Sequence, residues 1–221
     1  MAVVRTQHRV TGNIRREQIL TMAAELFAQL GYRGTTTRLI AERAGINEAI
    51  LFRHFPTKED LYWAVIESKC LERKREGELE ARLASASDDR EVFRTIASEI
   101  LQSSQQDTTM MRLLLFSALE NHRLSERFFH SFLAGRYELL AAYIRRRIEA
   151  GAFQKVDPHL AARSFVGMLV YHILIQELFG GKHYQNFDPR HVSETMTNIW
   201  LQGMKAHADR SSVQKATDIY V

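Results

Sequence analysis

Residues 39–52, Leu39-Ile40-Ala41-Glu42-Arg43-Ala44-Gly45-Ile46-Asn47-Glu48-Ala49-Ile50-Leu51-Phe52, predict two short helices joined by a tight turn. Gly45 can adopt the left-handed backbone conformation that such a turn requires. Asn47 is a good N-cap for the second helix, and Ile46 and Leu51 occupy the two positions of a hydrophobic staple around it. Two short helices that cross at a tight turn match a helix-turn-helix, which places its second helix in the major groove of DNA.

The second helix has an apolar face and an outward face. Helical spacing turns Ile46, Leu51 and Phe55 inward together. The outward face then carries Glu48, Ala49, Phe52 and Arg53. A DNA-reading helix would present this outward face to the bases.

The basic residues of the chain are concentrated around this segment. Residues 1–58 contain nine Lys and Arg but four Asp and Glu, a net charge of +5, whereas the remainder of the 221-residue chain has a net charge of −1. A basic module on a near-neutral body favours a polyanionic partner for the module.

Apolar residues recur at helical spacing along nearly the whole chain, and the pattern predicts an all-α fold. Glycines stand just past several predicted helix ends, and Asp-Pro pairs open two of the predicted helices. The nine predicted helices cover approximately residues 14–30, 35–44, 47–55, 57–82, 89–105, 108–121, 125–150, 158–179 and 189–208.

Nine short motifs occur in order before residue 63: Ile19-Leu20, Ala23-Ala24, Leu26-Phe27, Gly31-Tyr32, Thr35-Thr36, Ile40-Ala41, Ala44-Gly45-Ile46, His54-Phe55 and Lys58-Glu59-Asp60-Leu61-Tyr62. With them, residues 14–62 resemble the DNA-binding domain of TetR-family transcriptional regulators. The rest of the chain is similar to that family only in length and helical character.

The resemblance implies a domain organisation. We expect a flexible basic arm at residues 1–13 and a three-helix helix-turn-helix domain at residues 14–62. A larger helical domain at residues 63–208 would bind a ligand and dimerise, and residues 209–221 would form a polar tail.

The resemblance also implies which residues contact DNA. Five polar residues match phosphate-contacting positions of the family: Thr36, Thr37, Asn47, His54 and Lys58. The two threonines and Asn47 are equally explained as helix caps, and the two roles can coexist. The full set of expected DNA contacts is Thr36, Thr37, Arg38, Asn47, Glu48, Ala49, Ile50, Phe52, Arg53, His54 and Lys58.

Three positions in this set leave alternatives open. Phe52 replaces the family's usual tyrosine, so a hydroxyl contact to phosphate is absent, and Asn47 replaces the usual Ser or Thr cap. Glu48 would either accept a hydrogen bond from cytosine N4 or only stabilise the helix N-terminus. The arm at residues 1–13 would either enter a minor groove or form a disordered basic tail.

The middle helices are rich in aromatic residues and Met. Such residues build hydrophobic ligand pockets, and they also build ordinary cores. The expected ligand-binding residues are Met110, Phe116, Phe128, Phe132, Tyr137 and Tyr171.

The last two predicted helices are apolar around much of their circumference. Two such helices from each subunit would form a four-helix dimer interface, and the alternative is an intramolecular core. The expected interface residues are Phe165, Met168, Leu169, His172, Ile173, Gln176, Val192, Met196, Ile199, Trp200 and Met204.

Other functional classes lack support in the sequence. The one cysteine, Cys70, cannot form an internal disulfide, which favours a reducing compartment, and we expect the cytoplasm. No signal peptide is visible, and charges interrupt the most apolar stretch, so we expect no membrane partner. The histidines lack metal-ligand spacing and no catalytic motif is present, so we expect no metal, no cofactor and no enzyme activity.

These patterns predict a ligand-responsive transcriptional regulator. We expect a repressor that binds a palindromic operator in double-stranded DNA as a homodimer and is released by a small apolar effector. The rival predictions are an activator, a constitutive DNA-binding protein without an effector, and an all-α interaction module that binds no DNA.

Overall fold

A computed structural model describes residues 2–72, 76–85, 88–120 and 123–206, which are helical apart from turns and one isolated bridge between Phe153 and Lys205. The all-α prediction is confirmed for these ranges. The α-helices are α1 (Ala2–Gly34), α2 (Thr37–Arg43), α3 (Glu48–His54), α4 (Lys58–Glu72), α5 (Glu76–Ser85), α6 (Asp89–Gln106), α7 (Thr109–Leu119), α8 (Arg123–Phe128), α9 (Ala134–Glu149), α10 (Pro158–Ile173) and α11 (Pro189–Met204). Short π-helical segments, η1 (Phe129–Leu133) and η2 (Leu174–Leu178), and a 3-10 turn, η3 (Gly181–His183), complete the order.

The helices form two compact units whose division does not follow sequence order. Unit 1 comprises residues 1–75 and 107–134, and unit 2 comprises residues 76–106 and 135–221. Helices α7 and α8 therefore belong to the same unit as the helix-turn-helix, although they lie far beyond it in sequence.

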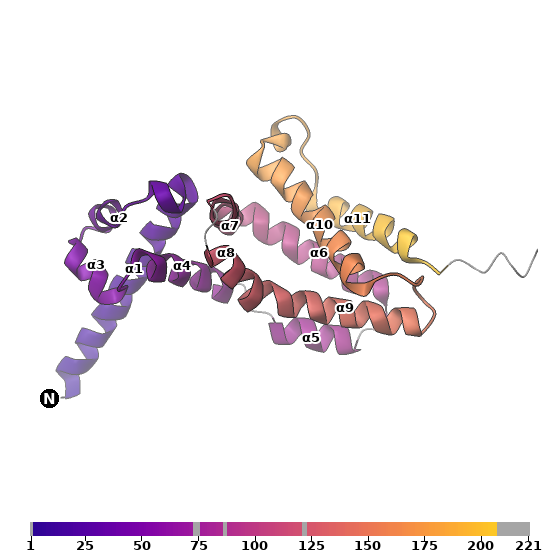
Figure 1. Ribbon diagram of the computed structural model, residues 1–221, viewed down its shortest axis with the longest axis horizontal. Coiled ribbons are helices and arrows are strands. Elements are labelled where there is room, and N and C mark those ends of the chain that lie inside the picture. The colour runs from indigo at the N-terminus through magenta and orange to yellow at the C-terminus, as the bar shows by residue number, and fades with distance from the viewer. Residues whose placement is uncertain (1, 73–75, 86–87, 121–122, 207–221) are drawn as a thin grey trace, which may run out of the picture. The chain divides into compact units, whose positions relative to one another are not determined.

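Unit 1 is organised around α1, which packs against α2, α4 and α7 (Figure 1). Its core contains Phe27, Leu51, Tyr62 and Leu113, all fully buried. The edge of the Tyr62 ring meets Phe27 at a centroid distance of 4.7 Å, and the Tyr62 hydroxyl donates to the Leu113 carbonyl over 2.7 Å. Burial raises the pKa of Tyr62, so this hydroxyl keeps its proton and its hydrogen bond to α7.

Polar contacts add to the packing of α7 on α1. The Arg112 guanidinium donates to the Ala28 carbonyl over 2.6 Å. Beyond the end of α7, the Glu120 carboxylate accepts from the Arg33 backbone N–H over 3.0 Å. Gly31 lies beside these groups with φ of 74°, a left-handed conformation that ends the regular part of α1 where the sequence predicted an end.

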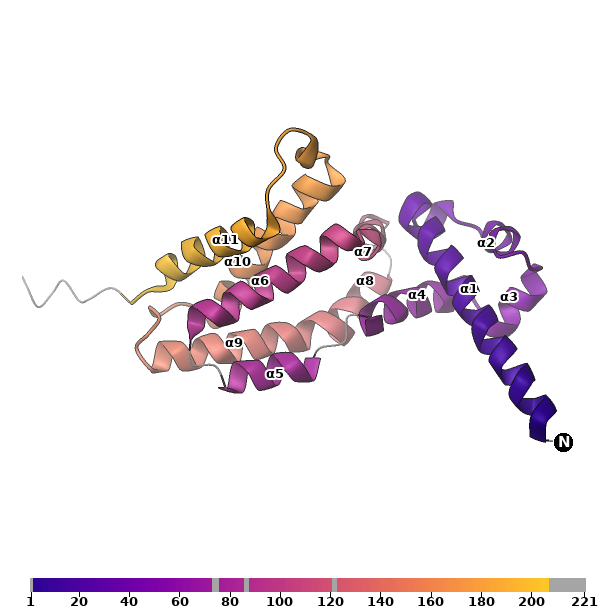
Figure 2. The same ribbon diagram turned by 180° about the vertical axis from the view of Figure 1, so that it is seen from behind.

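Unit 2 contains α6 packed against both α10 and α11, which also contact each other (Figure 2). Its core centres on Phe93, whose ring lies 4.9 Å from Phe165 and 4.3 Å from Trp200 between centroids. In the described ranges, residues 158–178 form the one helical stretch long and apolar enough to cross a bilayer. Phe165 and Leu169 of that stretch are fully buried in unit 2.

Local signals at helix starts are confirmed. The carboxylates of Asp157 and Asp188 cap α10 and α11, and Pro158 and Pro189 occupy the first turns. Three helix boundaries differ from the predictions. The backbone of residues 2–13 continues α1 where an arm was expected, and the predicted helix over 57–82 is represented by α4 and α5. The predicted helix over 125–150 contains the π-helical segment η1. The predicted tail lies outside the described residues.

Candidate nucleic-acid interface

The helix α3 is held by one face and exposes the other. Leu51 and Phe55 are buried, with 0% and 3% of their surface exposed, and Ile46 is half-buried. Phe52 and Arg53 on the opposite face are exposed. The predicted division of this helix into inward and outward faces is confirmed.

The turn before α3 has the predicted geometry. Gly45 adopts φ of 66°, in the left-handed region. The Ile46 N–H donates to the Ala41 carbonyl over 3.0 Å, which closes the turn. The Asn47 Oδ1 atom then accepts from the Ile50 N–H over 2.9 Å, so Asn47 is the N-cap of α3.

The caps of α2 and α3 keep donors that no other group among the described residues engages. The Thr36 Oγ1 atom accepts from the Leu39 N–H over 3.1 Å, which leaves its own hydroxyl proton available. Asn47 uses its carbonyl oxygen as a cap and keeps its NH₂ group available. Both residues are exposed, so each can cap a helix and donate to a phosphate at the same time.

Thr37 differs from Thr36 because its hydroxyl is already engaged. Its Oγ1 atom donates to the Glu48 Oε1 atom over 2.6 Å, which links the first turn of α2 to the first turn of α3. A hydroxyl has one proton to donate, so a phosphate would have to compete with Glu48 for it.

The cations of this region differ in their surroundings. Arg38 pairs with Glu42 over 2.9 Å, but both side chains are exposed and such a surface pair is weak. The Lys58 Nζ atom lies 4.3 Å from the centroid of the Tyr32 ring. Burial lowers the pKa of Lys58, and the negative charge of Glu120 offsets this only in part. Arg53 is exposed and forms no ion pair within the described ranges.

All eleven expected DNA contacts lie on α2, α3, their N-caps and the first residue of α4. Residues spread along more than twenty positions therefore belong to two adjoining short helices and one helix start. Their contact with DNA stays a prediction.

Two family models match the chain. The model for bacterial regulatory proteins of the tetR family matches residues 19–65, and the model for the C-terminal domain of AefR-like transcriptional repressors matches residues 91–201. The chain belongs to the TetR family of transcriptional regulators. The helix-turn-helix described above is thus the DNA-binding element of a TetR-family protein.

Individual TetR-family proteins resemble the chain over most of its length. The nucleoid occlusion factor SlmA of Vibrio atlanticus is 29% identical over 158 residues, which cover 70% of this chain and 80% of SlmA. NalD, the secondary repressor of the MexAB-OprM multidrug efflux pump in Pseudomonas aeruginosa, has a similar structure, with a TM-score of 0.69, 20% identity and coverage of 89% and 100%. FadR of Bacillus subtilis, solved in complex with stearoyl-CoA, gives a TM-score of 0.65 at 18% identity and coverage of 85% and 98%. The two structural likenesses show a shared fold.

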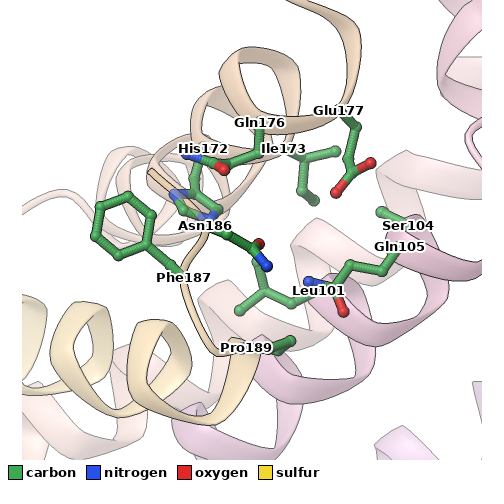
Figure 3. A pocket seen from close by; sticks show the side chains of 10 residues that line it. All are labelled: Leu101, Ser104, Gln105, His172, Ile173, Gln176, Glu177, Asn186, Phe187 and Pro189. Carbon is green, nitrogen blue, oxygen red and sulfur yellow. The ribbon is translucent and has the colours of Figure 1, made fainter. Parts of the chain in front are cut away.

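A small cavity with both polar and apolar walls lies in unit 2 of this TetR-family chain (Figure 3). Residues of α6, the end of α10 with η2, and the segment before α11 surround it, among them Gln105, His172, Gln176, Glu177 and Asn186. Its volume of about 10 Å³ is enough for one water molecule. Burial lowers the pKa of His172, while nearby Glu177 acts in the opposite direction.

A larger groove of about 220 Å³ lies in unit 1 between α1 and α4. Leu20 and Val65 contribute apolar walls, and Glu25 and Lys69 contribute charges. Sequence analysis missed this groove because it depends on how α1 and α4 pack against each other.

The expected ligand-binding residues are divided between the two units. Met110, Phe116, Phe128 and Phe132 belong to unit 1, where Met110 and Phe128 are part of the core. Tyr137 and Tyr171 belong to unit 2, and Tyr171 is 65% exposed. None of the six lines either cavity described above. Unit 1 therefore uses Met110 and Phe128 in its own core, and Phe132 packs against that core.

Most of the expected dimer-interface residues lie in the core of unit 2. Phe165, Leu169, Ile173, Gln176, Val192, Trp200 and Met204 are buried within the single chain, and Met168, His172 and Met196 are half-buried. Ile199 is the member of this set that is exposed, with 58% of its surface accessible. Phe165 of α10 and Trp200 of α11 pack on Phe93 of α6, so these two helices contribute apolar side chains to the unit's own core.

Proposed function

We propose that this TetR-family protein is a ligand-responsive repressor that binds a palindromic operator as a homodimer in the cytoplasm. The observation that carries the proposal is the outward face of α3. It combines exposed Ala49, Phe52 and Arg53 with two neighbouring caps, Thr36 and Asn47, that keep free donors. Such a face can reach base edges while the caps hold the phosphates on either side.

Dimerisation would use the exposed faces of α10 and α11. Leu160, Gly167, Val170 and Tyr171 follow one another at helical spacing on α10 and are exposed, as is Ile199 on α11. A single DNA-binding domain is too small for tight specific binding, and two such domains about 34–36 Å apart match successive major grooves. The exposed stripe therefore supports an isologous interface between two copies.

The effector would be a largely apolar small molecule with one polar group, bound within the region that the AefR-like C-terminal model matches. The similar fold of FadR, solved with stearoyl-CoA, supports a ligand of this general kind. Helices α4 and α7 give the effector a route to the DNA-binding element. The Tyr62 hydroxyl and Arg112 tie α7 to α4 and α1, so a ligand that displaces α7 would also displace α3.

Operator affinity with and without effector tests this proposal. Mass spectrometry of molecules retained by the native protein would first identify the effector. A coupling of 1–3 kcal/mol would weaken operator binding about 5–150-fold, and operator DNA would weaken effector binding by the same factor. Identical effector affinities with and without saturating operator would remove the regulatory role.

A constitutive DNA-binding protein is the second candidate. The similarity to SlmA, which is named a nucleoid occlusion factor, favours this candidate. Specific DNA binding that no retained molecule alters would support it over the repressor.

A further inference from the structure

The acidic residue on the outward face of α3, Glu48, is held in one orientation. Glu48 is half-buried, and its Oε1 atom accepts the Thr37 hydroxyl proton over 2.6 Å. A hydrogen bond to a carboxylate is stronger than one between neutral groups, so Thr37 restricts the rotation of this side chain. Within the described ranges, no other side-chain bond engages Glu48, which leaves the Oε2 atom free to accept.

Few groups on DNA can bind the remaining carboxylate oxygen of Glu48, Oε2. Phosphates repel it, and it can only accept hydrogen bonds. In the major groove, guanine presents O6 and N7 and thymine presents O4, all of which are acceptors. Adenine offers its N6 amino group beside the acceptor N7, whereas cytosine offers its N4 amino group with no acceptor beside it. Cytosine is therefore the base whose edge best complements Glu48.

We propose that Glu48, positioned by Thr37, accepts a hydrogen bond from a cytosine N4 amino group in each half-site and so selects a C·G pair there. The inference rests on the proposed operator binding and adds a base preference to it. Glu48 is a base-contacting residue in this scheme, and Thr37 is a positioning residue that acts through it.

The same carboxylate reduces affinity for DNA in general. A negative charge among the contacts of a basic module weakens the attraction to every phosphate, whatever the sequence. Glu48 thus attracts a base with an amino donor at this position and repels bases that present an acceptor there. Both effects contribute to discrimination between sequences. Removal of the carboxylate should make binding tighter on random DNA and less selective at one position.

Selection of bound duplexes from a random library tests the proposal. The wild-type chain is compared with Glu48→Ala, Glu48→Gln and, as a control with the same loss of charge, Glu25→Gln on exposed α1. We expect wild type and Glu25→Gln to enrich cytosine at one symmetric position of a palindrome. Glu48→Ala should lose about tenfold or more of the discrimination at that position, the size expected for one good base contact. Glu48→Gln should shift the preference to adenine, because an amide pairs with adenine N6 and N7.

Thr37 is tested by Thr37→Val and Thr37→Ser. The valine variant keeps the shape but loses the donor, so discrimination at the same position should fall, and the serine variant should restore it. A merely structural role for Thr37 would leave the base preference unchanged.

Each outcome separates this inference from the proposed function. If wild type and both Glu48 variants enrich the same base at every position of one palindrome, operator binding stands and the role of Glu48 is overturned. If wild type enriches no sequence, the proposed operator binding fails, and the base contact fails with it. A base change confined to one symmetric position in the Glu48 variants supports the inference.

Discussion

Among Arg38, Arg53 and Lys58, Arg53 has the fewest contacts with the described residues. It is exposed, whereas Arg38 pairs with Glu42 and Lys58 lies over the Tyr32 ring. We expect Arg53→Ala to weaken operator binding by at least about 1 kcal/mol, or roughly fivefold, because a phosphate or base contact is lost. Fluorescence anisotropy on a selected duplex measures this change.

The control for Arg53→Ala is Arg94→Ala, which removes the same charge from an exposed position on α6 of unit 2. We expect that control to bind the duplex nearly as tightly as wild type. Equal losses in the two variants would mean that Arg53 acts only through net charge.

At the residue scale, the sequence predicts features that depend only on neighbouring residues in the chain. The Asn47 cap and the Gly45 turn were predictable because each depends on residues within four positions of it. The bond between Thr37 and Glu48 was not, because it joins two helices through a turn whose detailed geometry must be known. Two adjacent threonines consequently have different roles, although the sequence alone treats them alike.

At the scale of the elements, the end of α1 is packed tightly against the end of α7. A Cβ atom on Gly31 would lie 2.9 Å from the Phe116 ring and 2.6 Å from Glu120 Oε1, and the residue has φ of 74°. Gly45 has a similar φ of 66°, but its Cβ would meet nothing within 4 Å. Backbone strain and steric overlap therefore both oppose a side chain at Gly31, whose ψ is 177°, whereas only backbone strain opposes one at Gly45.

We expect Gly45→Ala to lower the free energy of unfolding by about 1–2 kcal/mol, the cost of a left-handed conformation for alanine. Gly31→Ala should lower it by more, because φ of 74° with ψ of 177° lies in a region that is essentially restricted to glycine, and the overlap with Phe116 adds to that strain. Urea unfolding of the two variants measures the difference. A Gly31→Ala loss no greater than that of Gly45→Ala would contradict close packing of α7 on α1.

The start of α7 carries a pH-sensitive contribution to stability. The Asp107 carboxylate accepts from the Thr109 N–H over 2.8 Å and from Lys69 over 3.0 Å. Burial alone would raise the pKa of Asp107, but these contacts outweigh it and lower the pKa to about 2. Since that value is below the unfolded value of about 3.9, the stabilisation is complete above pH 4 and is lost as the pH falls toward 2.

We expect Asp107→Asn to lower the free energy of unfolding by about 1 kcal/mol at pH 7, because the amide lacks the charge that strengthens the bonds to Lys69 and Thr109. The difference from wild type should shrink between pH 4 and pH 2. Urea unfolding over this pH range measures it. A difference that stays constant with pH would contradict the ionised state of Asp107 in the folded chain.

At the scale of the whole molecule, the proposed binding of a palindromic operator requires two DNA-binding domains, and so a dimer. We expect Val170→Asp with Ile199→Asp to give a soluble monomer with weakened operator binding, because both side chains are exposed on α10 and α11. Leu169→Asp should instead unfold the chain, because Leu169 is fully buried and an unpaired charge there is costly. Light scattering and circular dichroism distinguish these results. A dimer that persists in the double variant would place the interface elsewhere.

The long-range arrangement marks the limit of prediction from sequence. Apolar periodicity predicts that α10 and α11 are buried, but it does not say which side meets α6 and which side stays exposed. Phe165 and Trp200 therefore read as interface residues until their packing on Phe93 is known. The membership of α7 in unit 1 depends on contacts such as that between Tyr62 and Leu113, fifty-one positions apart.

The most direct test of DNA recognition by the α2–α3 surface is the operator affinity at 50 mM and 200 mM salt, measured in parallel on a selected and a scrambled duplex. A dimer that neutralises 6–10 phosphates should lose about 10³–10⁵ in affinity across this range. At each salt concentration, the selected duplex should bind about 10³-fold or more tightly than the scrambled one. Affinity that is independent of salt, or equal for both duplexes, would contradict sequence-specific DNA binding by this chain.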